Sequence, residues 1–509
     1  MLKKNLMETT RLVASLLIAL IQLGAGFLFL FTPGTAGAQA TAPTALPDSG
    51  EAEQVAKTQY YSSQSFVYLD PGETYLFRLK NGTLKPLRLK SVREFKDSVI
   101  GLIRRADVRV ELDRQPLDLV CAPYVMPTEA RGIRIQADTT SAWLDLPKRV
   151  QFSLWDATDP IVDTRRFRFP LRNYRLFSHG TQAYDEPVHL GAGDGDPVGQ
   201  RFYHDYGFDL AGYEGREEVV SAVEGKIVKF WPSQEDPCSV LVQDHNGLIW
   251  EHAHLKALAP ELALDARVAL GQKLGILGKT GPSGNFSHLH LGTYLTRHDL
   301  DLDRANRRLN LYPWLVTAYQ AQHPKGLFAV ARPHQTVLTG EKVILDGGNS
   351  LAWGVSRIIE WRWLFPDGQT VKQARAEKTF DQPGAHVATL WVKNDQGTED
   401  VDFCQIKVFS KANPEKAMPH IFMTYTPTQD IRPDQPVTFR LWFQGKGGGP
   451  LKVDFGEGTQ RADYQSYSEL RHSFKTPGIY IVTAQGDAVG LPITQKQKVV
   501  VTATPKAQE

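Results

Sequence analysis

The stretch Gly284-Asn-Phe-Ser-His-Leu-His-Leu291 decides the fold class of the region around it. It is an apolar run in which two histidines, His288 and His290, stand two residues apart. Side chains at positions i and i+2 of a β-strand share a face, so both imidazoles are expected to point the same way. Leu289 and Leu291 then point to the other side. The stretch therefore predicts a strand with one histidine-bearing face and one apolar face.

Two other clusters carry histidine or carboxylate side chains upstream of this strand. They read Tyr203-His-Asp-Tyr-Gly-Phe-Asp209 and Trp250-Glu-His-Ala-His-Leu255. The same alternation predicts that His252 and His254 share a strand face. One His-x-His pair alone is compatible with coincidence, but a zinc site needs neutral imidazoles that converge with a carboxylate and leave a position for water. The three clusters together favour such a site.

The order of these clusters along the chain resembles the lysostaphin-type (LytM-like) metalloendopeptidases, which cut peptide cross-links of bacterial cell walls. The resemblance covers about residues 179 to 320 and is carried by six features in the family order. These are His204 with Gly207 and Asp209, the strand Val220-Ser-Ala-Val-Glu-Gly-Lys-Ile-Val228, a hairpin at Asp244-His-Asn-Gly247, His254-Leu255, the glycine-punctuated run Gly271-Gln-Lys-Leu-Gly-Ile-Leu-Gly-Lys-Thr-Gly281, and His288-Leu-His290.

The resemblance implies roles for five side chains. His204, Asp209 and His290 correspond to the zinc ligands, and His254 and His288 to the two catalytic histidines that do not bind the metal. Two imidazoles and one carboxylate leave Zn²⁺ a net positive charge and an open position, which suits polarising a carbonyl and activating water. The two other histidines can then transfer protons and stabilise the oxyanion.

Two positions depart from the family pattern. Asp209 lies five residues after His204, where the family has four, and an odd separation on a regular strand would face the two side chains oppositely. A bulge or turn must therefore intervene, and Asp205 remains an alternative ligand. The second departure is His252, which stands where the family has an aromatic residue. It is expected to contact substrate or to replace the aromatic ring in packing.

The flanking sequence predicts a mostly β, multidomain chain in which an antiparallel β-sheet peptidase core is flanked by immunoglobulin-like β-sandwiches. Residues 59–172 alternate short apolar runs with turn motifs such as Asp70-Pro-Gly72 and predict an N-terminal β-domain. The peptidase domain is expected at 173–324 and closes with a short helix that begins near Leu311. Residues 326–410 resemble a PKD domain, and 418–503 a second PKD-like or immunoglobulin-like domain.

The N-terminus predicts export. Basic residues precede an apolar stretch from Leu12 to Phe31 and the small-residue pattern Ala36-Gly-Ala38-Gln-Ala40, so 1–40 is expected to be a signal peptide or a membrane anchor. Residues 41–58 are expected to form a flexible linker. The expected location is therefore periplasmic, cell-surface or secreted. Only three cysteines are present, which argues against a disulfide framework.

Charge and motifs together define the expected partners. Lys plus Arg number 58 and Asp plus Glu 56, so the chain has no broad positive field for nucleic acid. The resemblance implies peptidoglycan peptides or another extracellular peptide as substrate, with contacts to glycan or protein through the PKD-like domains. Two other readings stay open: a catalytically inactive scaffold or activator of other wall hydrolases, and a purely adhesive surface protein.

Overall fold

The computed structural model describes most of the chain after residue 61. The described ranges are 62–99, 101, 103–144, 146–172, 187–189, 202–204, 207–231, 238–281, 283, 287–301, 309–412, 418–444, 450–462, 468–488 and 490–503. The expected export segment 1–40 and linker 41–58 lie outside these ranges. Across them, none of the helices is long and apolar enough to cross a bilayer.

Two antiparallel sheets of four strands each build the first described region. Their orders are β1-β8-β7-β6 and β2-β3-β4-β5. The strands are β1 Ser65–Leu69, β2 Thr74–Arg78, β3 Leu84–Lys96, β4 Ile103–Leu112, β5 Gln115–Cys121, β6 Thr128–Ala130, β7 Ile133–Thr140 and β8 Val150–Asp156. Alternate residues of both sheets, among them Val108 on β4 and Phe152 on β8, form one apolar core. The predicted turn glycine Gly72 has a positive φ, as does Gly82 in the turn between β2 and β3.

One carboxyl group lies buried on β7. Asp138 accepts hydrogen bonds from Ser153 Oγ at 2.5 Å and from Gln151 Nε2 at 3.3 Å. Burial raises its pKa from 3.8 to about 7. The folded chain therefore retains a proton that the unfolded chain releases above pH 4, and stability is lost progressively as the pH rises from 4 to 7.

We expect Asp138→Asn, which removes this charge, to raise the thermal unfolding temperature of this region relative to wild type at pH 8 but not at pH 4. The difference in unfolding free energy is on the order of 4 kcal/mol for a shift of this size. Calorimetry at the two pH values measures it. Asp118→Asn is the control, because Asp118 is an exposed carboxylate paired with Arg109. An equal gain from both variants, or no dependence on pH, would contradict the interpretation.

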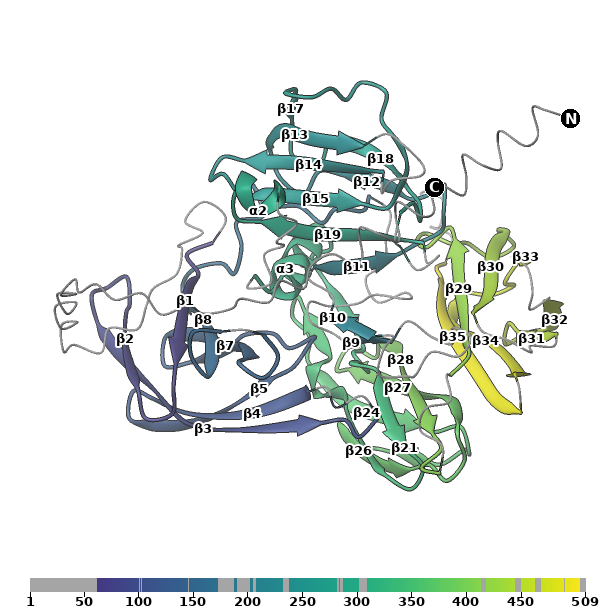
Figure 1. The fold of residues 1–509 in the computed structure, drawn as a ribbon. Coiled ribbons are helices and arrows are strands. Elements are labelled where there is room, and N and C mark those ends of the chain that lie inside the picture. The colour runs from purple at the N-terminus through teal and green to yellow at the C-terminus, as the bar shows by residue number, and fades with distance from the viewer. Residues whose placement is uncertain are drawn as a thin grey trace, which may run out of the picture. The chain divides into compact units, whose positions relative to one another are not determined.

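The second described region is built on a six-stranded antiparallel sheet in the order β11-β19-β15-β14-β13-β17 (Figure 1). A three-stranded sheet, β12-β18-β16, and a two-stranded sheet, β10-β9, accompany it. The elements are β9 Pro187–His189, β10 Phe202–His204, β11 Phe208–Ala211, β12 Glu218–Val220, β13 Gly225–Trp231, β14 Ser239–Asp244, β15 Ile249–Ala253, β16 Leu255–Leu258, β17 Arg267–Val268, β18 Lys273–Leu277, β19 His288–Tyr294, α2 Arg297–Asp301 and α3 Tyr312–Gln322. The predicted hairpin at Asp244 and the closing helix are both present.

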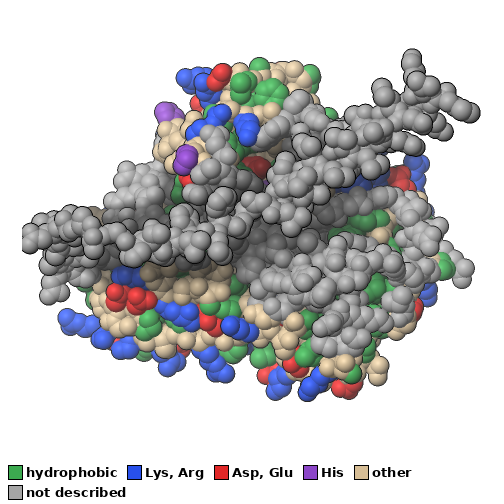
Figure 2. Space-filling model, in the orientation of Figure 1, with side chains coloured by type: hydrophobic (Ala, Val, Ile, Leu, Met, Phe, Trp, Pro, Cys, Tyr) green, Lys and Arg blue, Asp and Glu red, His purple; other side chains and the backbone are tan. Residues whose placement is uncertain are grey.

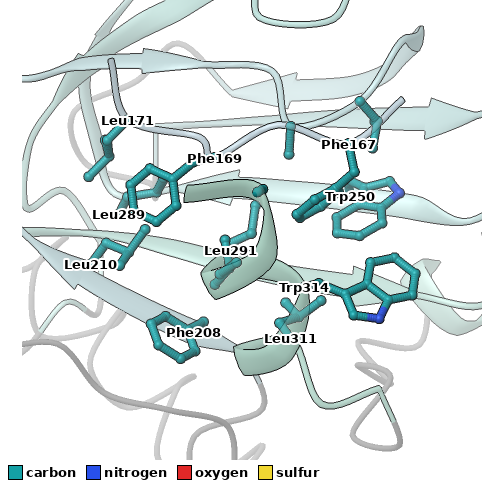
Figure 3. Close-up of a cluster of buried hydrophobic side chains, with 14 of the residues drawn as sticks. Phe167, Phe169, Leu171, Phe208, Leu210, Trp250, Leu289, Leu291, Leu311 and Trp314 are labelled. Atoms are coloured by element: carbon teal, nitrogen blue, oxygen red, sulfur yellow. The ribbon is translucent and has the colours of Figure 1, made fainter. Parts of the chain in front are cut away.

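One face of the six-stranded sheet packs into the apolar core of this region. The labelled side chains in Figure 3 come from β11, β15 and β19, from helix α3 and Leu311 just before it, and from the segment 167–171. The ring of Trp250 lies 5.3 Å from that of Phe167 and 6.1 Å from that of Trp314. Residues 167–171, which the sequence placed with the N-terminal β-domain, thus pack into the core of the six-stranded sheet. Because side chains alternate, the polar residues of β11 and β19 must lie on the opposite face.

The third described region begins at Gly326. Within the described ranges its regular elements are all β-strands, apart from one short 3₁₀ helix, η2 Gly347–Asn349. Its strands are β20 Gly326–Phe328, β21 Gln335–Leu338, β22 Lys342–Asp346, β23 Leu351–Trp353, β24 Ile358–Leu364, β25 Thr370–Val371, β26 Arg375–Thr379, β27 Gly384–Asn394, β28 Glu399–Phe409, β29 His420–Thr426, β30 Val437–Gln444, β31 Leu451–Asp454, β32 Thr459–Ala462, β33 Ser468–His472, β34 Gly478–Ala488 and β35 Leu491–Val501. One nine-stranded sheet contains strands of both expected sandwiches, joined where β27 pairs with β35. The ion pair between Lys498 and Asp400, at 3.0 Å, is buried where they meet.

Candidate functional site

Strands β11 and β19 bring three of the five predicted site residues onto one face of the sheet. Asp209 on β11 pairs directly with His290 on β19, and Ala211 pairs with His288. Residues directly opposite each other on paired strands share a face, so Asp209, His288 and His290 lie together, away from Leu289 and Leu291. The prediction that His288 and His290 share a face is confirmed.

The carboxylate of Asp209 connects the two imidazoles. Its Oδ1 lies 2.8 Å from Nδ1 of His290, and its Oδ2 lies 3.3 Å from Nε2 of His288. Asp209 is only 2% exposed, and burial alone would raise its pKa. The neighbouring imidazoles His288 and His290 outweigh burial, so the pKa of Asp209 lies below its usual value. The carboxylate is therefore ionised at neutral pH.

His254 reaches the same place from the bend between β15 and β16. Its ring centroid lies 4.5 Å from that of His288 and 6.1 Å from that of His290. Its Nδ1 lies 2.8 Å from the carbonyl oxygen of Thr280. Burial, and then the proximity of His288 and His290, lower the pKa of His254 to about 3, so this imidazole is neutral at neutral pH.

The prediction that His252 shares a face with His254 is wrong. His252 pairs with Leu291 and Ala253 with His290, so His252 points to the core side of the sheet. Its fully buried Nε2 accepts a hydrogen bond from the backbone N–H of Ala222 at 3.2 Å. His254 leaves the strand with φ of +65°, a left-handed conformation that rotates its ring to the opposite side. Of the two roles expected for His252, the structure supports packing.

The odd spacing between His204 and Asp209 is accommodated by a break between two strands. His204 ends β10, which pairs with β9, and Asp209 belongs to β11, which pairs with β19. The two residues thus belong to strands of different sheets, so the parity argument for one regular strand does not apply. The structure describes the backbone of His204 but not its side chain, and Asp205 lies outside the described residues.

Gly207, between these strands, lies against the ring of His290. A Cβ atom built there would come within 2.4 Å of the backbone oxygen of Leu291 and within 3.0 Å of Nε2 of His290. Any larger residue would therefore displace the imidazole. The sequence identified this glycine only as part of the motif with His204 and Asp209, whereas its steric role needs the structure.

The residues present fit a zinc ion by the chemistry of their donor atoms. Asp209 and His290 offer a carboxylate oxygen and an imidazole nitrogen that already face each other at 2.8 Å. A set of one ionised carboxylate and neutral imidazoles is among those that hold zinc in catalytic sites. Among the residues whose side chains are described, no group of three is already arranged around a common metal position. His204, the third predicted ligand, is not among them.

Sequence comparison assigns two parts of the chain to known families. Residues 203–302 match the model of Peptidase family M23, and residues 328–408 match that of the PKD domain. The first match contains all five predicted site residues. Both matches confirm the resemblance inferred from the sequence motifs, including a PKD domain on the C-terminal side. No curated protein sequence matches the chain.

Several solved structures match parts of this chain. The lytM protein of Ruminococcus gnavus is 22% identical, covers 31% of this chain and 61% of its own length, and has a TM-score of 0.22. The antimicrobial peptidase lysostaphin from Staphylococcus simulans is 15% identical, with coverage of 49% and 98% and a TM-score of 0.23. A zinc containing peptidase from Vibrio cholerae is 14% identical, with coverage of 41% and 82% and a TM-score of 0.20. The chain therefore spans about three fifths of the length of the first of these.

Proposed function

From the premise that residues 203–302 form a domain of Peptidase family M23, we propose that the chain is an exported, zinc-dependent endopeptidase that hydrolyses peptide cross-links of peptidoglycan. One observation carries the proposal. Asp209, His254, His288 and His290, from three separate segments, form a single buried cluster on one sheet face. Buried polar groups are costly to retain in a core and are concentrated at functional sites.

In this proposal His204, Asp209 and His290 hold the metal. When bound, zinc supplies a Lewis acid that polarises the scissile carbonyl and makes water a stronger acid. Asp209 contributes one negative charge, and the imidazoles of His204 and His290 contribute none. The doubly charged zinc ion would therefore keep a net positive charge towards the substrate. The interaction of Asp209 Oδ2 with His288 fixes the orientation of the carboxylate.

His254 and His288 are assigned to proton transfer and charge stabilisation. Because the partner of His254 Nδ1 is a carbonyl oxygen, that nitrogen must carry the proton and donate it. Its Nε2 is therefore the basic nitrogen, which can accept a proton from an attacking water. His288 lies beside it, with its own Nε2 directed at Asp209. These two rings provide one acceptor and one donor for passing a proton to the leaving amine.

Export and substrate class belong to the same proposal. The order of basic, apolar and small residues in 1–40 supports export to the periplasm, the cell surface or the medium. The PKD domain supports positioning on a glycan or a protein. Figure 2 shows basic and acidic side chains mixed over the described part of one face, which agrees with the near balance of 58 basic and 56 acidic residues and with a partner other than nucleic acid.

The second candidate function is an inactive scaffold that activates other wall hydrolases. Product analysis separates it from the enzyme. We expect the purified full chain, supplied with zinc, to release peptides with new amino termini from isolated peptidoglycan, which mass spectrometry identifies. If the protein cleaves an unrelated unfolded protein but leaves the peptidoglycan uncut, the substrate is a protein and not peptidoglycan. Absence of any new amino terminus from both substrates would favour the scaffold.

A further inference from the structure

A single side chain links three segments around His254. The hydroxyl of Thr280 accepts a hydrogen bond from the backbone N–H of Cys238 at 2.8 Å and donates one to the carbonyl oxygen of Leu255 at 2.9 Å. The carbonyl of the same threonine accepts the proton of His254 Nδ1 at 2.8 Å. Thr280 therefore contacts both the ring of His254 and the carbonyl oxygen of the next residue, Leu255.

The backbone at His254 is held in a conformation that histidine does not favour. A left-handed φ is unfavourable for a residue other than glycine, so neighbouring contacts must stabilise it. Here the chain leaves β15 in the six-stranded sheet and enters β16 in the three-stranded sheet. The N–H of Leu255 donates to the carbonyl of Cys238 at 2.8 Å. The Thr280 hydroxyl bonds the remaining backbone groups of these two residues, the N–H of Cys238 and the carbonyl of Leu255.

The segment that carries Thr280 fits closely against β16. A Cβ atom at Gly278 would lie 2.4 Å from the backbone nitrogen of Lys256, and one at Gly275 would lie 2.3 Å from the carbonyl oxygen of Ala257. Gly281 has φ of +65°, so the chain turns immediately after Thr280. The glycines of the run 271–281 thus allow a close approach to β16, which places the Thr280 hydroxyl between the backbones of Cys238 and Leu255.

We propose that Thr280 is the positioning residue of His254. Its hydroxyl bridges Cys238 and Leu255, the residue after His254, which keeps the left-handed backbone. Its carbonyl keeps the ring in the tautomer that leaves Nε2 free to accept a proton. The expected effect of Thr280 on turnover rests on the proposed function, whereas its effect on the structure of His254 does not. No zinc ligand is touched, so metal binding is unaffected.

Two variants of the full chain separate the hydroxyl from the shape of the side chain. Thr280→Val keeps the branched shape and leaves the Cys238 N–H and the Leu255 carbonyl without their partner, whereas Thr280→Ser keeps the hydroxyl. We expect Thr280→Val to lower kcat about 10- to 100-fold with KM and zinc content unchanged, because a misplaced proton acceptor affects chemistry more than binding. Thr280→Ser should restore most of kcat.

A matched control is Thr317→Val on helix α3. The hydroxyl of Thr317 also donates to a backbone carbonyl, that of Pro313 at 2.7 Å, but it lies in the helix away from the cluster. This variant should lose some thermal stability and keep kcat. If Thr280→Val lowers kcat no more than Thr317→Val does, the positioning role is refuted.

Two further readouts do not depend on catalysis. In metal-free protein, Thr280→Val should speed deuterium exchange at the amide of Leu255, and the ¹⁵N ring shifts of His254, assigned with a His254→Gln variant, should change from the Nδ1–H tautomer to a mixture. Unchanged exchange and an unchanged tautomer would overturn the inference. Wild-type protein that keeps both features but cuts no peptide would refute the proposed function and leave the positioning role standing.

Discussion

Replacing Asp209 with asparagine is expected to abolish stoichiometric zinc and hydrolysis together. The substitution keeps the size of the side chain but removes the only charged ligand of the proposed set and places an amide beside His290 and His288. Neutral ligands alone hold zinc less tightly, and loss of a buried charge that two imidazoles contact also changes their orientation. Metal analysis after dialysis should give well below 0.1 zinc per chain, and turnover should fall by about 10⁴-fold or more.

Asp244→Asn is the matched control for this experiment. Asp244 is another buried carboxylate of the same domain, but it accepts hydrogen bonds from the backbone N–H of Leu248 and from Nε1 of Trp250 in the β14–β15 hairpin. This variant should be less stable and should still bind one zinc. An Asp209→Asn protein that keeps full zinc and activity would show that another residue, such as Asp205, is the carboxylate ligand.

Replacing His288 with alanine is expected to separate metal binding from catalysis. The ring of His288 lies beside His254 and against Asp209, yet it is not one of the proposed ligands. Zinc content should therefore stay near one per chain, while turnover falls by about 10²- to 10⁴-fold, the usual range for loss of a positioned acid or base. Zinc and rate must be measured on the same preparation.

His252→Gln serves as the control for His288→Ala, because His252 is a buried histidine on the opposite face of the sheet. Glutamine can still accept the hydrogen bond from Ala222, so zinc and turnover should both remain close to wild type. If His288→Ala loses its zinc, or retains wild-type turnover, the division of roles between His288 and His290 is incorrect.

The strand pattern of the sequence was sufficient to predict the shared face of two of the five site residues, His288 and His290. Alternation in His288-Leu-His290 fixes which side chains share a face, and the structure places both imidazoles at the carboxylate of Asp209. The same rule failed at His252 and His254 because one residue adopts a left-handed φ where the chain changes sheets. Nothing in the local sequence marks that backbone angle, and the residue that we propose to stabilise it, Thr280, lies 26 residues away.

Tertiary packing accounts for the other differences between sequence and structure. Phe167, Phe169 and Leu171 read as the end of an N-terminal β-domain, but they fill the core behind Trp250 and Leu291 (Figure 3). Two C-terminal sandwiches were expected to stand in tandem, whereas their strands share one sheet through Ala385 and Ile493. Both features depend on which apolar surfaces pack against each other. Hydrophobic periodicity in the sequence predicts that a surface is apolar but not which other surface it contacts.

The most direct test of the zinc peptidase assignment is the metal content of the purified full chain, measured with its turnover on a soluble cross-linked muropeptide. The same preparation is assayed as isolated, after removal of metal by a chelator, and after addition of one equivalent of zinc. We predict one zinc per chain with activity, loss of both on chelation, and recovery of both together. Activity that persists without metal, or one tightly bound zinc with no cleavage in any state, would contradict the assignment.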